Sequence, residues 1–343
     1  MLKYVIKRLV LAFFTLLIIL SITFILMKLL PLEIPVDKAQ KAIYLGEQIK
    51  LGYVFDSPFK ITGYGKEIAM VVSEDTGKTT YYYNVPIFQQ LFLWFKNIVT
   101  SGKWGTSTNV WVNVDAFVII MKRLPNSIKI NIISVIFSVP LGIFLGIVAA
   151  LNKNKPVDNV ISTLVMMIVS IPGFVLIILS QQYLGFQWKI LPATFTKSND
   201  PVLIAKSYIL PVILLSLGSI CGYCRAVRGE LCEVMESEYL LLARTKGLTK
   251  RQAIIRHALR NAMVPIVPSI LAEFIGILGG SMILEYVFEI NGIGGLFIKA
   301  IETKDYNVLM VDMAFFTTIS LTAGVFLDIS YGFIDPRIRM GER

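Results

Sequence analysis

Apolar positions along the chain gather into six long runs that are separated by polar stretches. A helix needs about 20 apolar residues to cross a bilayer, and the runs approach or exceed that length. They comprise residues 9–30, 128–151, 160–184, 208–223, 265–288 and 308–334. The pattern therefore predicts an all-α polytopic membrane protein with six transmembrane helices, the third of them kinked at Pro172-Gly173.

The polar segment after the first run predicts a small folded insertion that contains both helix and strand. Residues 36–50 have the spacing of a short amphipathic helix. Residues 67–83 alternate apolar and polar side chains around a turn, which predicts a β-hairpin. Residues 86–99 carry an aromatic stripe that is typical of a helix lying at a membrane interface. The stripe consists of Phe88, Leu91, Phe92, Trp94, Phe95 and Ile98.

Between the fourth and fifth runs lies a polar, arginine-rich loop, residues 225–264, which predicts two helices joined by a tight turn. The first helix carries Glu238 and an apolar set on one face. The apolar residues are Leu231, Val234, Met235 and Leu242. Gly247 lies where this helix should stop, because glycine adopts the left-handed cap conformation without a steric clash. Thr249 and Gln252 have the spacing of a capping box, so a second helix should start at once.

Composition agrees with the membrane class, and charge suggests the topology. The chain is 55% hydrophobic and 16% charged, with a mean hydropathy of +0.69, whereas soluble domains have about 45–50% apolar and about 25% charged residues. The formal net charge is +10, but the basic residues flank apolar runs and form no stripe with aromatics, so no nucleic-acid partner is expected. All arginines except Arg123 fall on one side, which predicts cytoplasmic N- and C-termini in the cell membrane.

Few residues suggest chemistry of their own. Cys221, Cys224 and Cys232 fall short of the four ligands of a structural zinc site, so we expect reduced, packed side chains and no metal. Gly77-Lys78-Thr79 resembles the end of a nucleotide-binding P-loop, but Val72 occupies the position of its first glycine. We therefore expect no enzyme activity and no cofactor in this chain.

Ionisable residues inside membrane spans are costly and are functional candidates by default. Glu273 in the fifth run and Asp312 in the sixth are candidates to line a translocation pathway or to face a partner subunit, and the sequence leaves both roles open. Asp328, near the end of the sixth run, is expected to pair with a basic group.

From Glu238 to Pro265 the loop reads EYLLLARTKGLTKRQAIIRHALRNAMVP, which resembles the cytoplasmic EAA loop of ABC importer permeases. The closer resemblance is to the first permease of oligopeptide, dipeptide and nickel importers. Further matches are Arg123-Leu124-Pro125, Gly279-Gly280, Glu285, Gly292-Ile293-Gly294, Asp305-Tyr306 and the closing Asp335-Pro336-Arg337-Ile338-Arg339. The chain departs from the pattern in Leu241-Leu242-Ala243, which lacks the triplet's glutamate, in Arg260 at the final proline, and in a large segment at 32–83.

The resemblance implies a type I ABC importer permease-like fold and a transport role. This chain and a second permease would form the pathway for peptide uptake, surrounded by membrane lipid. Two cytoplasmic ATPases would bind ATP and Mg²⁺, and an extracellular binding protein would deliver the cargo. The chain would divide into residues 1–31 with the first span, an extracellular insertion at 32–123, and a permease core at 124–343.

The resemblance also implies a coupling loop that meets the ATPases. The residues expected to act there are Glu238, Ala243, Arg244, Gly247, Thr249, Arg251, Ile254, Ile255, Arg256 and Leu259. We expect Ile254, Ile255 and Leu259 to anchor in an ATPase groove, with Arg251 and Arg256 at its rim. Glu285 joins Glu273 and Asp312 as a candidate residue of the pathway.

Other functions stay open. A nickel chelate or another small solute is an alternative cargo. A secondary transporter or channel would work without ATPases, but that class favours an internal repeat with broken helices, and the two halves display none. A membrane-anchored scaffold that binds a partner would leave the charged spans and the EAA-like loop unexplained.

Overall fold

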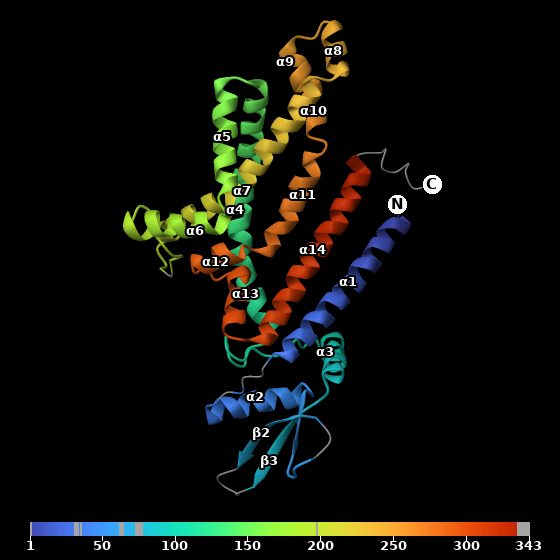
Figure 1. Cartoon of the computed structure of the whole chain (residues 1–343), viewed down its shortest axis with the longest axis vertical. Helices are drawn as coiled ribbons and strands as arrows, with labels where there is room; N and C mark the ends of the chain where they lie inside the picture. Colours follow the sequence, from blue (N-terminus) through green and yellow to red (C-terminus); the bar gives the residue numbers. More distant parts are fainter. Residues whose placement is uncertain are drawn as a thin grey trace. The chain divides into compact units, whose positions relative to one another are not determined.

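The computed structural model describes residues 2–30, 34, 36–61, 65–72, 78–196 and 198–334. These residues divide into two compact units, whose helices and strands are labelled in Figure 1. The span unit is drawn from Met1–Leu9, Arg123–Ile298 and Thr318–Arg343, and the insertion unit from Val10–Lys122 and Lys299–Thr317.

The span unit is helical. The elements that lie in it or enter it are α4 (Ala116–Leu151), α5 (Pro156–Ser170), α6 (Gly173–Ser180), η1 (Gln181–Gln187), α7 (Pro201–Met235), α8 (Glu238–Thr245), α9 (Lys250–Ala253), η2 (Ile254–Ala258), α10 (Leu259–Ala262), α11 (Ile266–Gly276), η3 (Ile277–Gly279), α12 (Met282–Val287), α13 (Ile293–Glu302) and α14 (Tyr306–Ile334). Here η1 and η2 are π-helical and η3 is a 3₁₀ turn.

The described residues contain five helical segments long and apolar enough to cross a membrane. They are Val5–Leu29, Ala116–Leu151, Pro201–Met235, Ile266–Val287 and Tyr306–Ser330. The pair Pro156–Ser170 and Gly173–Gln187 is bent by 90° and makes a sixth if it counts as one span. The helical membrane fold is thus confirmed, and the kink expected at Pro172-Gly173 is a right-angle bend. Pro172 causes it, because proline biases the residue before it toward extended backbone, and Ile171 has φ −93° and ψ 126°.

Three boundaries differ from the sequence expectation. The second span begins at Ala116, and the fourth runs from Pro201 to Met235, well beyond 208–223. The fifth is broken after η3, where Gly280 has a φ of +65°. The segment at 291–306, between the last two apolar runs, is mostly helix α13. Its buried residues Ile293, Leu296 and Ala300 recur at helical spacing, a signal that the neighbouring glycines obscured.

Helices α4 and α7 pack closely through glycine. A Cβ on Gly142 would lie 2.8 Å from Cβ of Tyr223, and one on Gly146 would lie 2.7 Å from Cβ of Val227. These distances are shorter than van der Waals contact, so only glycine permits this approach. Gly142 and Gly146, four residues apart, thus place two glycines on one face of α4 and permit close helix contact. Ser134 and Ser216 join the same helices by a buried hydrogen bond of 2.9 Å.

The insertion unit combines helices with a small antiparallel sheet. Its own elements, with the span helix that enters it, are α1 (Leu2–Leu29), α2 (Lys38–Lys50), β1 (Val54–Ser57), β2 (Glu67–Val72), β3 (Thr79–Asn84) and α3 (Ile87–Ser101). The strand order is β1-β3-β2, with Val54 opposite Asn84 and Val72 opposite Thr79. The predicted helix at 36–50 and hairpin at 67–83 are confirmed, whereas strand β1 was not foreseen.

The core of the insertion unit forms where α3 meets the end of α1. Trp94 is buried against Phe24, with ring centroids 5.2 Å apart, and Phe24 also meets Tyr53 edge-to-face at 6.0 Å. The aromatic stripe predicted on α3 is thus divided between two faces. Trp94 packs inside, while Phe88 and Phe92 are 76% and 69% exposed.

Candidate functional site

The predicted helical hairpin lies at one end of the span unit, where α8 and α9 are seen in Figure 1. The first arm was expected to be one helix, but it is interrupted. Helix α7 ends at Met235 and α8 begins at Glu238. The hydroxyl of Ser237 donates to the carbonyl of Val234, a local bond that competes with helix continuation. The interruption gives α8 a direction of its own.

The turn of the hairpin has the predicted geometry. Gly247 has a φ of +94°, and nothing lies within 4 Å of the position a Cβ would take. The amide of Gln252 donates to Thr249 Oγ1 at 3.3 Å, and the amide of Thr249 donates to Gln252 Oε1 at 3.1 Å. These reciprocal bonds form the predicted capping box, which starts α9.

The inner face of the hairpin is a small apolar core. Its buried members are Ala150, Leu231, Cys232, Leu240, Ala253, Ile254, Ala258 and Ala262. Ile254 is only 8% exposed, so its side chain packs inside the hairpin. This placement argues against the expectation that Ile254 anchors an outside partner. The core also joins the hairpin to the ends of α4 and α7, so the hairpin does not stand free of the spans.

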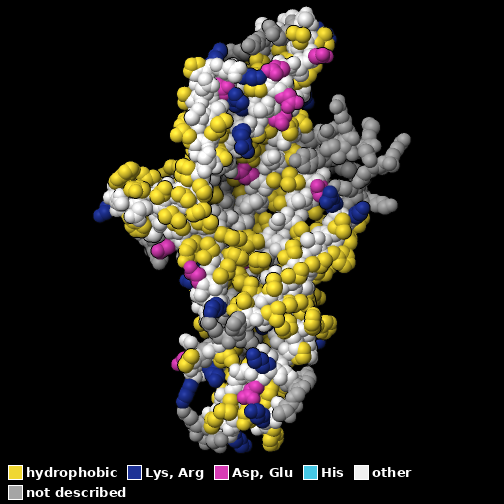
Figure 2. Space-filling model, viewed as in Figure 1, with side chains coloured by type: hydrophobic (Ala, Val, Ile, Leu, Met, Phe, Trp, Pro, Cys, Tyr) yellow, Lys and Arg dark blue, Asp and Glu magenta, His cyan; other side chains and the backbone are white. Residues whose placement is uncertain are grey.

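Outside this core the hairpin exposes three large apolar side chains, which together are called its outer face below. Leu241, Leu242 and Ile255 are 63%, 57% and 56% exposed. Glu238 and Arg256 are also exposed, whereas Ala243 and Leu259 are half-buried and Thr249 is exposed at the turn. The side chains of Arg244 and Arg251 lie outside the described residues. Figure 2 shows charged side chains gathered around this end of the span unit, while hydrophobic side chains cover the helices below it.

An ion pair between a half-buried arginine and a buried aspartate connects α5 to α7 near the hairpin. Arg228 Nε and Nη2 donate to the two carboxylate oxygens of Asp158 at 2.6 and 2.7 Å. Asp158 also accepts the amide of Asn154 at 3.0 Å and the hydroxyl of Ser162 at 3.1 Å, and it is 1% exposed. The bidentate geometry fixes orientation as well as distance. Sequence reading missed this pair, because its members lie far apart along the chain.

A second, exposed ion pair joins the turn between α4 and α5 to the end of α7. Lys153 donates to Glu236, the residue directly after α7, and this hydrogen bond raises the pKa of Lys153. Together the two ion pairs fasten the α4–α5 turn to α7 just before the hairpin begins.

The ionisable residues of the spans have different environments. Glu273 is half-buried and accepts the hydroxyl of Ser219 at 2.6 Å, which joins α11 to α7. Glu285 is 1% exposed and accepts the amides of Ser281 and Gly295, both at 3.1 Å. Asp328 pairs with Arg8 at 3.1 Å, as the sequence predicts.

Glu285 is enclosed by glycine backbone. A Cβ on Gly292 would lie 2.1 Å from Glu285 Oε2, and one on Gly280 would lie 2.8 Å from Oε1. The motif residues noted in the sequence therefore meet around one carboxylate. In the conformation described, Glu285 faces the chain's own amides, whereas Glu273 remains partly accessible.

Two further acidic residues lie in the insertion unit. Asp312 is fully buried there. Asp305, also buried, accepts the hydroxyl of Ser107 at 2.6 Å. The same oxygen accepts the amides of Thr108, Asn109 and Val110 at 3.0–3.1 Å. Asp305 thus holds the loop before α4 against the start of α14, a role that the motif Asp305-Tyr306 alone did not reveal.

Comparisons with a family model and with individual proteins agree on one family of transport proteins. A family model described as the binding-protein-dependent transport system inner membrane component matches residues 142–340. The dipeptide transport system permease protein DppB of Lactococcus lactis is 31% identical over 344 residues, with 99% of this chain and 100% of that protein covered. The oligopeptide transport system permease protein OppB of Haemophilus influenzae has the same identity and coverage. OppB of Escherichia coli is 30% identical, with 99% and 100% covered.

Proposed function

The chain belongs to the family of binding-protein-dependent transport system inner membrane components, and we propose that it is a permease subunit of an ATP-driven peptide importer. It forms the transmembrane pathway together with a second permease. Peptide as the cargo rests on the relatives, which are named dipeptide and oligopeptide permeases and match over their full length. The chain is a multi-pass membrane protein and a transport subunit, and ATP and Mg²⁺ are bound by two partner ATPases.

The observation that carries this proposal is the outer face of the hairpin. Leu241, Leu242 and Ile255 are exposed apolar side chains at the end of the span unit that also carries charged residues. A helix that docks in a groove needs an apolar anchor and complementary charge at its rim. We assign the anchor to these three residues with Leu259, and the rim to Glu238, Arg251 and Arg256. Ile254 supports the anchor from inside.

Movement of the ATPases reaches the spans through rigid connections. When an ATPase pair closes on ATP, a helix seated on it moves as a rigid body. The apolar core around Ile254 and Leu231 transmits this displacement from the hairpin to α7. The Asp158–Arg228 pair then carries α5 along with α7. Gly247 and the Thr249 capping box fix the angle between α8 and α9.

The topology follows from the same proposal. The hairpin and both termini face the cytoplasm in the cell membrane, and residues 32–123 face outward, where an extracellular binding protein delivers the cargo. Residues 1–31, 32–123 and 124–343 act as membrane anchor, outer insertion and permease core. Glu273, which is partly accessible, is the pathway candidate, whereas Glu285 and Asp312 support the surrounding fold.

Co-purification of the ATPases tests the docking face. Replacing Leu241, Leu242 and Ile255 together by Ser should abolish recovery of the ATPases with the permease pair. The matched control is Phe88→Ser with Phe92→Ser, which removes similarly exposed apolar side chains from α3. ATPase recovery that persists in the triple variant, or transport that proceeds without any ATPase, contradicts the proposal.

The cargo is tested separately. Mass spectrometry of ligands carried by the cognate extracellular binding protein should find peptides. If a nickel chelate or another solute is found instead, the chain is still an ABC permease but its cargo is not a peptide.

A further inference from the structure

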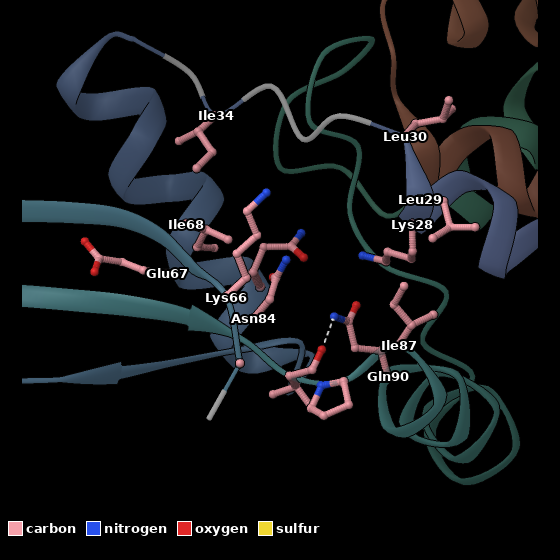
Figure 3. A pocket seen from close by; sticks show the side chains of 14 residues that line it. Lys28, Leu29, Leu30, Ile34, Lys66, Glu67, Ile68, Asn84, Ile87 and Gln90 are labelled. Atoms are coloured by element: carbon pink, nitrogen blue, oxygen red, sulfur yellow. Dashed lines mark hydrogen bonds between the residues drawn. The ribbon is translucent and has the colours of Figure 1, made fainter. Parts of the chain in front are cut away.

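The insertion unit contains a cavity that the transport role does not use. Its volume is about 650 Å³, within the range of pockets that hold small ligands. The end of α1, strands β2 and β3, and the start of α3 line it. Figure 3 shows Lys28 and Gln90 pointing toward one another on one side, with Lys66 and Asn84 on another. The cavity therefore brings basic and amide side chains together near the end of a membrane span.

Gln90 carries an unsatisfied acceptor at this cavity. Its amide nitrogen donates to the carbonyl of Val85 at 2.7 Å, which fixes the orientation of the side chain. The side-chain oxygen has no hydrogen-bond partner among the described residues, although Gln90 is only 2% exposed. An unpaired buried acceptor costs about 1–3 kcal/mol. A ligand with a hydrogen-bond donor would remove that cost.

Lys28 supplies a positive charge beside that acceptor. Its ammonium lies 4.4 Å from the centre of the Tyr53 ring and 5.7 Å from that of Phe24. These rings hold the ammonium without neutralising its charge. Glu67 also lines the cavity, but its carboxylate pairs with Lys60 at 3.6 Å, and among the described residues no carboxylate forms an ion pair with Lys28 or with Lys66. The cavity is therefore suited to an anion.

The side chains around this cavity are those expected at the level of lipid headgroups. Lys28 lies next to the last residue of the apolar span Val5–Leu29. A lysine at such a position extends its amine toward the headgroups. Helix α3, which carries Gln90, also exposes Phe88 and Phe92, as a helix at a membrane surface does. Binding of a soluble anion does not call for exposed apolar side chains beside the cavity, whereas binding of a lipid does.

We propose that the cavity binds the headgroup of a phospholipid that carries both an anionic phosphate and a hydrogen-bond donor. The phosphate contacts the ammonium groups of Lys28 and Lys66, and the donor bonds to the free oxygen of Gln90. Ethanolamine and glycerol headgroups have such a donor, whereas choline has none. A bound lipid of this kind would hold the insertion unit to the membrane surface at the end of α1.

The test uses the full chain purified with its partner subunits in detergent. Dioleoyl-phosphatidylethanolamine, -phosphatidylglycerol and -phosphatidylcholine are added in turn, while native mass spectrometry records bound lipid and a melting curve records Tm. The first two lipids should give a one-to-one adduct and a higher Tm, and the choline lipid should give neither.

Variants assign the effect to the cavity. Lys28→Met should weaken binding roughly five- to tenfold, because a charged contact to phosphate is lost. Lys28→Arg should restore it. Lys96→Met, at an exposed lysine of α3 outside the cavity lining, is the matched control and should bind normally. Gln90→Met should reduce the preference for ethanolamine over choline, a change that simple destabilisation does not produce.

Several results would overturn the proposal. One is equal binding of all three lipids. Another is normal binding by Lys28→Met in a variant whose Tm without lipid matches the parent. A third is inorganic phosphate alone producing the same rise in Tm, which would assign the cavity to a soluble anion.

Discussion

The α4–α7 contact and the α8–α9 hairpin both depend on glycine, but for opposite reasons. At Gly146 the backbone is regular helix, and the absent side chain makes room for Val227 and Cys224. At Gly247 there is open space, and the absent side chain permits a φ of +94°. The span contact is therefore fixed by packing between helices, and the hairpin by local backbone geometry. The first region is closed by packing within the chain, whereas the second exposes the apolar side chains of Leu241, Leu242 and Ile255.

The largest effect is expected at the Asp158–Arg228 ion pair, which fastens α5 to α7. Asp158→Ala would remove both hydrogen bonds to Arg228 and those from Asn154 and Ser162 to a buried carboxylate, which should cost about 3–4 kcal/mol of stability. Lys153→Ala removes the exposed pair with Glu236 and should leave Tm nearly unchanged. Melting curves of the purified complex in detergent compare the two. An equally small change for Asp158→Ala would mean that this pair does not fasten α5 to α7.

A second comparison uses neighbouring residues of the hairpin. Ile254→Ala should cost about 2–3 kcal/mol, because it opens a cavity in the hairpin core. Ile255→Ala should change stability by less than about 0.5 kcal/mol, because its side chain is exposed. ATPase recovery should fall for Ile255→Ala although its Tm is normal. If instead Ile255→Ala lowers Tm and Ile254→Ala does not, then Ile255 and not Ile254 packs in the hairpin core.

Gly146→Ala tests the span contact. The new methyl group would meet Val227 and Cys224, and the strain of overpacking should cost about 1–2 kcal/mol. Gly218→Ala, where nothing lies within 4 Å of the new methyl group, is the control on α7 and should be neutral or stabilising. A Tm that stays level or rises for Gly146→Ala, as it should for Gly218→Ala, would show that helix propensity, and not contact with α7, dominates at Gly146.

The smallest stability effect is expected at Gly247. Gly247→Ala forces a side chain into the left-handed region, at a cost of about 1 kcal/mol with no clash. Gly247→Asn should recover much of that cost, because asparagine tolerates this conformation. Transport should fall more than Tm does, since the angle between α8 and α9 changes. If Gly247→Ala transports at the parent rate, the angle between α8 and α9 does not determine how ATPase movement reaches the spans.

Local signals in the sequence predicted the hairpin well. The positive φ of Gly247 and the Thr249–Gln252 capping box depend on residues no more than three positions apart, and such patterns can be read directly. The same holds for α2 and for the β2–β3 hairpin. The pairing of Asp328 was also foreseen, because a charge in a span needs a partner, although Arg8 could not be named.

Features that need distant parts of the chain were missed. The Asp158–Arg228 pair joins residues that are 70 positions apart. The break in the fifth span was missed because it is made by Glu285 meeting glycines on both sides of it in the chain. Ile254 was taken for an outside anchor, since the pattern of the second arm does not reveal that Leu231 and Ala150 cover it. In each case tertiary packing decides what local periodicity leaves open.

The bend at Ile171-Pro172 also bears on whether the chain crosses the membrane an odd or an even number of times. Helix α5 has 15 residues and is about 22 Å long, which is shorter than the roughly 30 Å of a hydrocarbon core. It is too short to complete a passage alone, so this part of the chain makes a crossing only if Gly173–Gln187 supplies the remainder. An even number of passages would therefore require the helices on both sides of this proline-containing bend to act as one span.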